Sequence, residues 1–273
     1  TKVKGFRTTD GAGVKLVRVL GNLTTKEFDP ILMLDSFDSI NPDDYTAGFP
    51  MHPHRGIETI SYVSRGKMVH RDSLGNEAGI SDGEVQWMNS GSGIMHEEMV
   101  PAAERLLGVQ LWLNLPAKDK MSKPSYNSIK NEDIKEIEIE GGKIRLLAGK
   151  YGEHEGYKGD YLSMDYYDIH LNADAEVTLT MEEDDSVMVF TLLGDVYIDG
   201  EHIEEKTAVK LTEGDSLTIK NGNEKAQVLY MNSRALNEPV AWAGPIVMNT
   251  QEELQKAFLE LRSNTFIKET AEY

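Results

Sequence analysis

Apolar residues along this chain occur in short runs or at every second position, which are the patterns of β-strands. Strands are predicted at five places in the first half: 31–37, 57–63, 67–72, 84–88 and 108–115. Turn signals at 73–76 and 81–83 separate several of them. Residues 134–140 alternate strictly, and a second apolar run follows across Gly141-Gly142, which predicts a hairpin. Many short strands at such spacing indicate an all-β protein built as an antiparallel sandwich or barrel.

One segment near the end of the chain has a helical period instead. Its apolar residues fall at i, i+3, i+4 and i+7, namely Leu254, Ala257, Phe258 and Leu261. Thr250 and Glu253 precede this stripe with the spacing of a capping box. We therefore predict a C-terminal helix that docks its apolar stripe on a sheet.

The second half of the chain repeats parts of the first. Residues 187–200 resemble the segment that begins at 57, and residues 211–219 resemble 80–88. A period this long indicates duplication of a whole β-domain and not a solenoid repeat. We expect two domains, at residues 1–120 and 121–273, with the polar, Lys-rich segment 116–124 as the linker.

Composition and charge narrow the function classes. The net charge is −18, from 46 acidic and 28 basic residues, and no cluster of Lys and Arg offers a footprint for direct nucleic-acid binding. The sequence contains no cysteine, which excludes disulfides and Cys-based metal sites. No apolar run reaches the length of a membrane span. We expect a cytoplasmic protein that binds neither nucleic acid nor membrane.

Candidate chemistry lies in the stretch between Met51 and Met99. His52 and His54 form one i, i+2 pair, and His96 and Glu98 form another. Side chains at i and i+2 of a strand point to the same face, so two such strands could direct four ligands at one metal ion. Three imidazoles and one carboxylate suit a first-row divalent metal such as Fe(II), Mn, Ni, Co, Cu or Zn.

Other interpretations remain open at this point. A single His-x-His is more often a surface pair, and it is the second pair that favours a metal site. Glu97 competes with Glu98, although a regular strand would point it to the opposite face. Glu58 would share the face of His54, as a fifth ligand or as a group that orients a histidine. Structural or solvated roles are expected for the remaining four histidines, which are His70, His154, His170 and His202.

Several motifs together resemble the pirin family of the cupin superfamily. The strongest are His52-Pro53-His54-Arg55-Gly56-x-Glu58-Thr59, Gln86-Trp87-Met88 and Gly93-Ile94-x-His96-x-Glu98-Met99. Similar stretches are Asp29-Pro30-x-Leu32-x-Leu34-Asp35, Gln110-Leu111-Trp112-x-Asn114-Leu115 and Gly244-Pro245-x-Val247-Met248-Asn249-Thr250. They span nearly the whole chain.

The resemblance implies a bicupin, with two stacked antiparallel β-barrels of jelly-roll type. The N-terminal barrel would hold iron, most readily Fe(II), through His52, His54, His96 and Glu98, whereas Glu58 would not be a ligand. The second barrel would be degenerate. Alignment of its glycines with those of the first barrel places Thr180 and Glu182 at the positions of His52 and His54, and Gln227 at that of His96.

The resemblance also implies an activity, that of a quercetin 2,3-dioxygenase. Such an enzyme cleaves a flavonol with dioxygen and releases carbon monoxide, and Glu98 would act as the catalytic base. Arg55 would steer an anionic substrate or form a salt bridge. The alternative function is an iron-dependent, redox-sensing regulator that acts through a protein partner. A third option is a bicupin that only stores metal.

Overall fold

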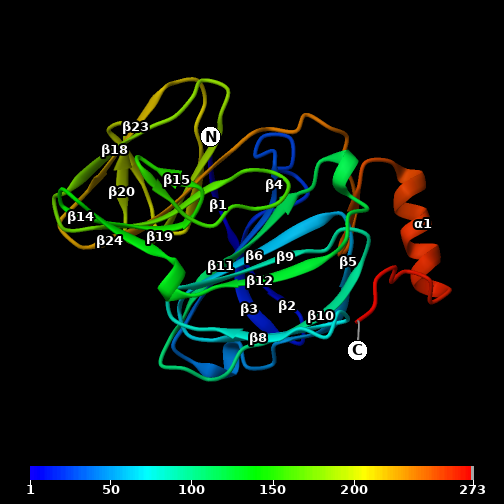
Figure 1. Ribbon diagram of the computed structural model, residues 1–273. Helices are drawn as coiled ribbons and strands as arrows, with labels where there is room; N and C mark the ends of the chain where they lie inside the picture. Colours follow the sequence, from blue (N-terminus) through cyan, green and yellow to red (C-terminus); the bar gives the residue numbers. More distant parts are fainter. Residues whose placement is uncertain (272–273) are drawn as a thin grey trace. The chain divides into compact units, whose positions relative to one another are not determined.

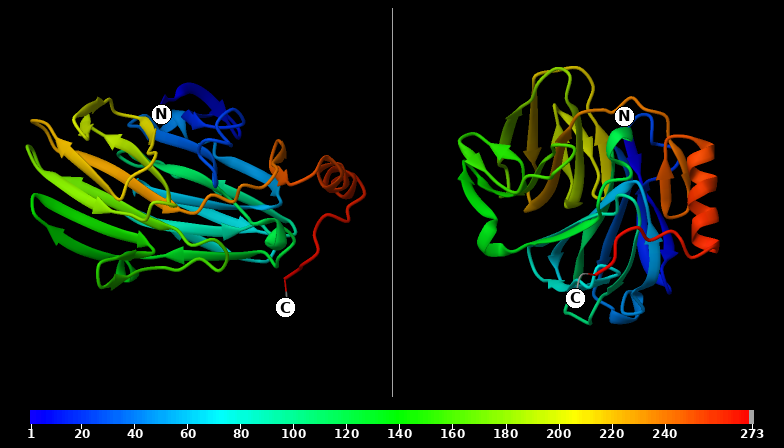
Figure 2. Two further views of the ribbon diagram at one scale, coloured as in Figure 1. Left: turned by 90° about the horizontal axis from the view of Figure 1, so that it is seen from above. Right: turned by 45° about the vertical axis from the view of Figure 1, so that its right-hand side comes forward.

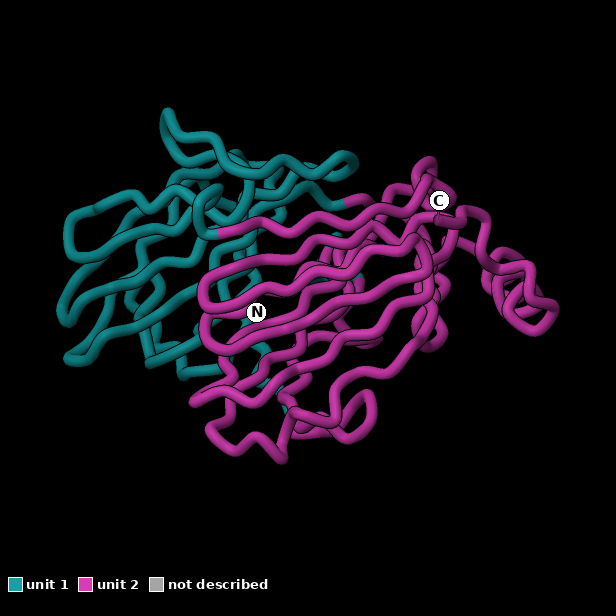
Figure 3. Tube along the Cα trace, turned by 60° about the horizontal axis from the view of Figure 1, so that its bottom comes forward, with its two compact units in different colours: residues 1–6, 26–30, 131–235 teal, residues 7–25, 31–130, 236–273 magenta. Residues whose placement is uncertain are grey.

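The computed structural model describes residues 1–271, which divide into two compact units (Figures 1 and 3). Unit 1 combines residues 1–6, 26–30 and 131–235. Unit 2 combines residues 7–25, 31–130 and the C-terminal segment from residue 236 onward. Each unit is thus assembled from segments that lie far apart in the sequence.

Unit 2 contains a seven-stranded and a four-stranded sheet (Figure 2). The strand orders are β12-β9-β6-β11-β4-β3-β2 and β5-β10-β7-β8. The bounds in chain order are β2 Phe6–Asp10, β3 Val14–Leu20, β4 Ile31–Ser39, β5 Phe49–His54, β6 Ile57–Arg65, β7 Met68–Asp72, β8 Glu77–Ile80, β9 Glu84–Asn89, β10 Ile94–Met99, β11 Leu106–Asn114 and β12 Ser125–Ile129. The strands predicted from the apolar runs are therefore confirmed, with ends that shift by one or two residues.

Unit 1 follows the same plan. Its seven-stranded sheet has the order β1-β22-β19-β24-β17-β14-β13, and its four-stranded sheet has the order β18-β23-β20-β21. The bounds are β1 Lys2–Lys4, β13 Lys135–Ile139, β14 Gly142–Ala148, β17 Asp165–Leu171, β18 Glu176–Thr180, β19 Ser186–Leu193, β20 Val196–Ile198, β21 Glu201–Ile203, β22 Thr207–Lys210, β23 Ser216–Asn221 and β24 Ala226–Ser233. The predicted hairpin is β13–β14, and the duplication of a β-domain is visible in the matching strand orders.

Apolar side chains fill the space between the two sheets of unit 1. One buried cluster takes residues from the seven-stranded sheet, including Ile144, Ile169 and Val228, and from the four-stranded sheet, including Ile198 and Ile219. Burial of apolar surface is the dominant favourable term in folding. The two sheets therefore pack face to face around a common core.

Short elements complete the fold. They are β15 Lys150–Tyr151, β16 His154–Glu155, β25 Ala241–Ala243, β26 Ile246–Met248 and three 3-10 helices at Pro42–Asp44, Ala117–Asp119 and Asn131–Asp133. Within residues 1–271 the one α-helix is α1, Gln251–Arg262, and no helix there is long and apolar enough to cross a membrane.

Helix α1 begins as the sequence predicts. The hydroxyl of Thr250 accepts a hydrogen bond from the backbone N–H of Glu253, whose carboxylate accepts one from the N–H of Thr250. Leu254 and Ala257 are buried against β25 and β26, with Phe258 beside them. The predicted all-β architecture with a C-terminal helix is confirmed.

The C-terminal segment is anchored in unit 2 by two buried cations. Arg55 is 2% exposed, and its Nη2 donates to the Glu260 carboxylate at 2.7 Å and to the carbonyl of Phe266 at 3.0 Å. Its guanidinium also lies 4.3 Å from the centroid of the Phe266 ring. Arg55 therefore forms a structural ion pair, and of the two roles expected for it the salt bridge is observed.

Lys120 forms the second anchor. Its Nζ donates to the carbonyl of Gly56 at 2.8 Å, to Oδ1 of Asn114 at 2.7 Å and to the carbonyl of Val247 at 3.0 Å. Gly56 has φ +83°, and a Cβ there would lie 1.9 Å from the carbonyl oxygen of Val247, so only glycine allows this approach. Burial lowers the pKa of Lys120 to about 7, although its three oxygen acceptors match the three donors of an ammonium.

These contacts change two expectations. The segment 116–124 is not a linker, because Lys120 is buried within unit 2 and β12 follows it in the same unit. The division into compact units also differs from a boundary near residue 120, since the C-terminal helix groups with residues 31–130. The sequence does not reveal these contacts, because Arg55 and Lys120 are more than 100 residues from their partners in the C-terminal segment.

Replacement of Arg55 by Met should destabilise unit 2 strongly. It breaks a buried ion pair, leaves Glu260 with only the more exposed Lys268 at 3.1 Å, and deprives the carbonyl groups of Ser92 and Phe266 of their donor, which costs about 3–5 kcal/mol. The matched control is Arg105→Met, which breaks a surface pair with Asp38 and should cost about 1 kcal/mol or less. Denaturant unfolding of both variants measures the difference, and equal losses would show that Arg55 is no special anchor.

Candidate metal centre

The two predicted histidine-bearing segments lie side by side in the four-stranded sheet of unit 2. Strand β5 pairs with β10 in antiparallel fashion, with His52 opposite His96 and His54 opposite Ile94. The turn before β10 is tight, because a Cβ on Gly91, at φ +41°, would lie 2.1 Å from the carbonyl oxygen of Ser122. The i, i+2 spacing therefore directs the imidazoles to one face, as predicted.

The three imidazoles converge on a common point. Nε2 of His52 lies 3.0 Å from Nε2 of His54 and 2.9 Å from Nε2 of His96. One ligand nitrogen from each histidine falls within 4.8 Å of the others. Two nitrogens bound at about 2.1 Å to one ion at a right angle lie about 3.0 Å apart. The donor set thus fits a divalent metal ion.

The outer nitrogens of His52 and His54 have fixed partners. Nδ1 of His52 lies 2.8 Å from the carbonyl oxygen of Pro50, and Nδ1 of His54 lies 2.9 Å from that of Pro245. A carbonyl oxygen only accepts, so each Nδ1 must carry the hydrogen and each Nε2 presents a lone pair. This is the tautomer that a metal ligand requires.

Burial keeps two of these imidazoles neutral. His54 is 2% exposed and His96 is 1% exposed. Burial and the neighbouring His52 lower the pKa of His54 to about 3, and burial lowers the pKa of His96 well below its usual value. Neutral imidazoles bind metal, whereas protonated ones do not.

Glu98 lies beside the imidazoles and is held by two amides. Its Oε1 is 3.6 Å from Nε2 of His96. Gln86 donates to Oε2 of Glu98 at 2.8 Å, and Gln110 donates to the same carboxylate at 3.1 Å. Burial raises the pKa of Glu98, while nearby imidazoles and these two amides oppose the rise. The carboxylate therefore has a fixed orientation and enhanced basicity.

The structure separates the two rival carboxylates from this cluster. Glu97 points to the other face of β10, where it forms an ion pair with Arg71 at 3.3 Å, as predicted. Glu58 lies on β6 in the seven-stranded sheet, beyond the turn at Gly56. The argument that Glu58 shares a strand face with His54 is therefore wrong, because the two residues belong to different strands.

Sequence reasoning missed His70, which is fully buried on β7, the strand next to β10. Its Nδ1 is 3.4 Å from Nδ1 of His96, and its Nε2 is 2.7 Å from Oδ2 of Asp72. The available signal was the His70-x-Asp72 spacing, which is the same i, i+2 pattern as the ligand pairs. His154 and His202, in contrast, are exposed, as expected.

A cavity of about 640 Å³ in unit 2 opens onto the cluster. His52, His54, Glu98 and Gln110 line it beside the cluster, and further polar groups of its lining come from Asp10, Arg18, Asn22 and Asp35. Its apolar walls come from Met33, Phe49, Pro50, Trp112, Trp242 and Pro245. The rings of Trp112 and Trp242 are 5.5 Å apart between centroids, and Trp112 also contacts His54 edge to face. The volume is that of a small-molecule site.

The corresponding strands of unit 1 carry aliphatic residues. Strands β18 and β23 take the places of β5 and β10 in the strand order. Their buried pairs are Val177 opposite Ile219 and Leu179 opposite Leu217, which offer no lone pair to a metal ion.

Of the positions predicted in the second barrel, Thr180 does lie on β18, the counterpart of β5, whereas the prediction for Gln227 is wrong. Thr180 is exposed at the end of β18, and Glu182 lies in the turn that follows. Gln227 lies on β24, the counterpart of β11 rather than β10, where it donates to Asp168 at 3.0 Å. The alignment failed because Gly214 follows β22, whereas Gly83 precedes β9, the counterpart of β22.

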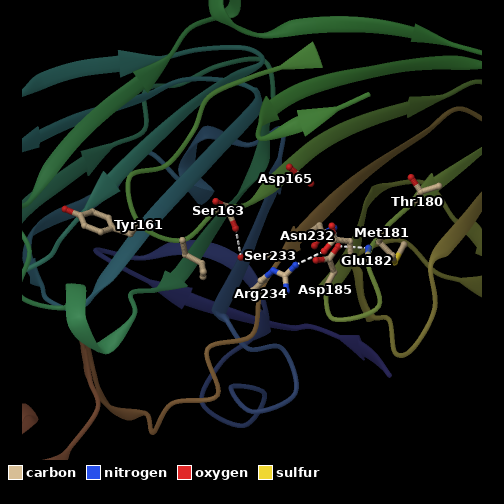
Figure 4. A pocket seen from close by; sticks show the side chains of 11 residues that line it. Tyr161, Ser163, Asp165, Thr180, Met181, Glu182, Asp185, Asn232, Ser233 and Arg234 are labelled. Carbon is tan, nitrogen blue, oxygen red and sulfur yellow. Dashed lines mark hydrogen bonds and ion pairs between the residues drawn. The ribbon is translucent and has the colours of Figure 1, made fainter. Parts of the chain in front are cut away.

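Unit 1 has a cavity of its own, of about 610 Å³ (Figure 4). Four of its polar side chains are engaged in pairs: Arg234 pairs with Glu182 at 2.7 Å, and Asn232 donates to Asp185 at 2.8 Å. The three-histidine cluster belongs to unit 2, so the chemistry expected for this chain lies there.

Comparisons with known proteins place the chain among pirins. The family model described as Pirin matches residues 13–113, and the one described as Pirin C-terminal cupin domain matches residues 166–267. A Pseudomonas aeruginosa protein provisionally named quercetin 2,3-dioxygenase is 39% identical over 94% of both chains. Human Pirin is 35% identical over 93% of this chain and 89% of its own length. A crystal structure of quercetin 2,3-dioxygenase from Acinetobacter baumannii has a TM-score of 0.88 at 30% identity, over 97% of this chain and 96% of that one.

Divalent metal should stabilise the wild-type protein, and His96→Ala should remove most of that gain. Binding to the folded state alone contributes about 2.7 kcal/mol at a metal concentration 100-fold above Kd. Thermal unfolding with and without Ni(II), together with elemental analysis, measures the effect. The control His154→Ala changes an exposed histidine of unit 1 and should behave as wild type. An undiminished gain in His96→Ala would exclude this cluster as the binding site.

Proposed function

The chain belongs to the pirin family and has its two cupin domains, and from this premise we propose that it is a metal-dependent dioxygenase. In this proposal it cleaves a flavonol such as quercetin and releases carbon monoxide. The observation that carries the proposal is the position of the imidazole cluster, which lies at the wall of a cavity large enough for a small aromatic molecule.

We propose that His52, His54, His96 and Glu98 hold the metal ion. The ion is Fe(II) in the first instance, although imidazole and carboxylate ligands also accept Mn, Ni, Co, Cu and Zn. A bound divalent metal supplies Lewis-acid activation and a template that brings the substrate oxygen and dioxygen together. Three neutral ligands and one carboxylate leave the site with a net positive charge, which favours an enolate over a neutral hydroxyl.

The cavity walls suit a planar aromatic substrate. Trp112 and Trp242 both line the cavity, with 41° between their ring planes, and an indole face there can stack on a flat ring of a flavonol. The indole N–H of Trp112 is buried and has no hydrogen-bond partner within residues 1–271. A buried donor without a partner is costly, and a substrate oxygen would satisfy it.

Glu98 is the proposed catalytic base. The proton of the flavonol 3-hydroxyl passes to its carboxylate, and burial raises the pKa of Glu98, which makes it a stronger base. Gln86 and Gln110 hold the carboxylate towards the cavity throughout. The balance is one flavonol and one dioxygen to one depside and one carbon monoxide, so both oxygen atoms of dioxygen enter the products.

A metal-dependent interaction protein is the second candidate function. Met51 and Met99 are exposed on the outer faces of β5 and β10, the strands that carry the histidines. Methionine side chains are adaptable and common at protein-binding surfaces. In this proposal, a change in the oxidation state of the metal alters the conformation of β5 and β10, and so alters the surface that a partner protein contacts on their outer faces.

Iron-loaded wild-type protein should consume quercetin, seen as loss of its visible absorbance and release of carbon monoxide. His96→Ala should reduce the rate to background. Glu98→Gln keeps the size of the side chain but removes the base, which should lower kcat by about 10²–10⁴-fold. Metal content is measured in parallel to separate loss of the base from loss of the ion.

The same assay distinguishes the two candidate functions. Quercetin consumed as fast by His96→Ala as by wild type would overturn the dioxygenase proposal. Negligible turnover by fully loaded wild type, with different bound proteins for the ferrous and ferric forms, would favour the interaction protein.

Trp242→Ala should raise KM for quercetin by about 3- to 10-fold with little change in kcat, because an aromatic stacking partner is worth about 0.5–1.5 kcal/mol. Steady-state kinetics measures this split. The control is Tyr197→Ala, which removes an exposed aromatic side chain of unit 1. An unchanged KM in Trp242→Ala would show that the substrate does not use this wall.

A further inference from the structure

His96 differs from the other two histidines in what holds its outer nitrogen. Nδ1 of His52 and of His54 each faces a carbonyl oxygen, which can only accept. Nδ1 of His96 instead faces Nδ1 of His70 at 3.4 Å, and an imidazole nitrogen can either donate or accept. The tautomer of His96 is therefore undecided until His70 is fixed.

Asp72 removes this ambiguity. Its Oδ2 lies 2.7 Å from Nε2 of His70, and a carboxylate only accepts, so Nε2 of His70 carries the hydrogen. In the neutral imidazole Nδ1 of His70 is then an acceptor. Nδ1 of His96 must donate to it, which leaves a lone pair on Nε2 of His96, the nitrogen 2.9 Å from Nε2 of His52.

The surroundings fix both members of this pair. The side chains of His70 and Asp72 have no exposed surface. Tyr126 stacks on the His70 ring with centroids 4.0 Å apart and an angle of 14° between the planes, which prevents rotation of the imidazole.

Backbone groups and the side-chain amide of Asn76, which donates to Oδ2 at 2.9 Å, orient the carboxylate of Asp72. Its Oδ1 accepts from the backbone N–H groups of Leu74 at 2.9 Å and Asn76 at 3.1 Å. Burial would raise the pKa of Asp72, but hydrogen bonds from His70 and Asn76 outweigh it and hold the pKa below its usual value. The carboxylate is thus ionised and turned towards His70.

We propose that Asp72 and His70 are positioning residues that fix His96 in the Nδ1–H tautomer and so keep its Nε2 available to a divalent metal ion. The inference rests on the proposed metal site of the dioxygenase. Neither residue touches the ion or the substrate in this arrangement. Their effect passes through His96 alone.

The decisive variant is Asp72→Asn. The backbone N–H groups of Leu74 and Asn76 would hold the amide oxygen at the Oδ1 position, so the NH₂ group would face Nε2 of His70. Two donors cannot face each other, and His70 would move its hydrogen to Nδ1. Nδ1 of His96 would then accept, and its Nε2 would carry the hydrogen in place of the lone pair. Replacement of such an aspartate is known to act through the tautomer of its histidine.

The first measurement uses the metal-free protein. Long-range ¹H–¹⁵N NMR of ¹⁵N-histidine-labelled protein reports which ring nitrogen carries the hydrogen. We expect Nδ1–H for His96 in wild type and Nε2–H in Asp72→Asn. This readout depends on neither metal loading nor turnover, so it is independent of the dioxygenase proposal.

The second measurement is the affinity for Ni(II), by titration calorimetry. Loss of an outer partner of a metal ligand lowers affinity by about 10- to 100-fold, which is the effect expected for Asp72→Asn. The matched control is Asp195→Asn, because Asp195 binds Nε2 of His202 at 3.0 Å in unit 1. It should leave Ni(II) affinity unchanged.

A third variant, His70→Gln, distinguishes an effect on the tautomer of His96 from a general loss of structure. In His70→Gln the side-chain oxygen can accept from Nδ1 of His96 without help from Asp72, so affinity should stay near wild type. In that background, Asp72→Asn should have little further effect, whereas a merely structural role of Asp72 would persist.

Two results would overturn the inference. One is Nδ1–H on His96 in both wild type and Asp72→Asn, with equal Ni(II) affinity. The other is an equal loss of affinity from Asp72→Asn with and without His70→Gln. If wild type instead shows the expected tautomer and affinity but no quercetin turnover, the dioxygenase proposal fails while the positioning pair stands.

Discussion

The site depends on one constraint, that three imidazole nitrogens lie close together and all present lone pairs. Nε2 of His52 is about 3 Å from that of each of its neighbours, His54 and His96. Such a cluster requires that the outer nitrogen of each imidazole carries the hydrogen and donates a hydrogen bond to an acceptor. The acceptors come from β5 itself, from the C-terminal segment and from β7, so three separate parts of unit 2 must be in place at once.

The C-terminal segment is therefore part of the site and not an appendage. It supplies the Pro245 carbonyl to His54 and the ring of Trp242 to the cavity. Arg55 and Lys120 bind this segment, and both lie next to elements that carry or support the ligands. Breaking a buried ion pair costs several kcal/mol, so detachment of the segment and loss of the site are coupled.

The sequence predicted correctly those features that depend only on residues close together in the chain. The i, i+2 spacing of His52 and His54 was enough, because strand geometry alone places both on one face. The capping box at Thr250 defined the start of α1 for the same reason. The prediction that the segment around Lys120 is a linker was wrong, because a lysine is expected to be exposed unless its distant acceptors are known. His70 was missed likewise, since its contact with His96 follows from the pairing of β7 with β10, although its spacing from Asp72 was visible.

Comparison of the two units shows what a polar interior requires. In unit 1 the strands that match β5 and β10 bury Val177, Leu179 and Ile219, which need no partners. Unit 2 places histidines there, and a half-satisfied buried polar network is worse than an aliphatic core. The polar groups around the imidazoles therefore need partners, which explains why amides hold Glu98 and why Asp72 binds His70. The indole N–H of Trp112, which has no hydrogen-bond partner within residues 1–271, lies at the same cavity and is a group that the proposed substrate would satisfy.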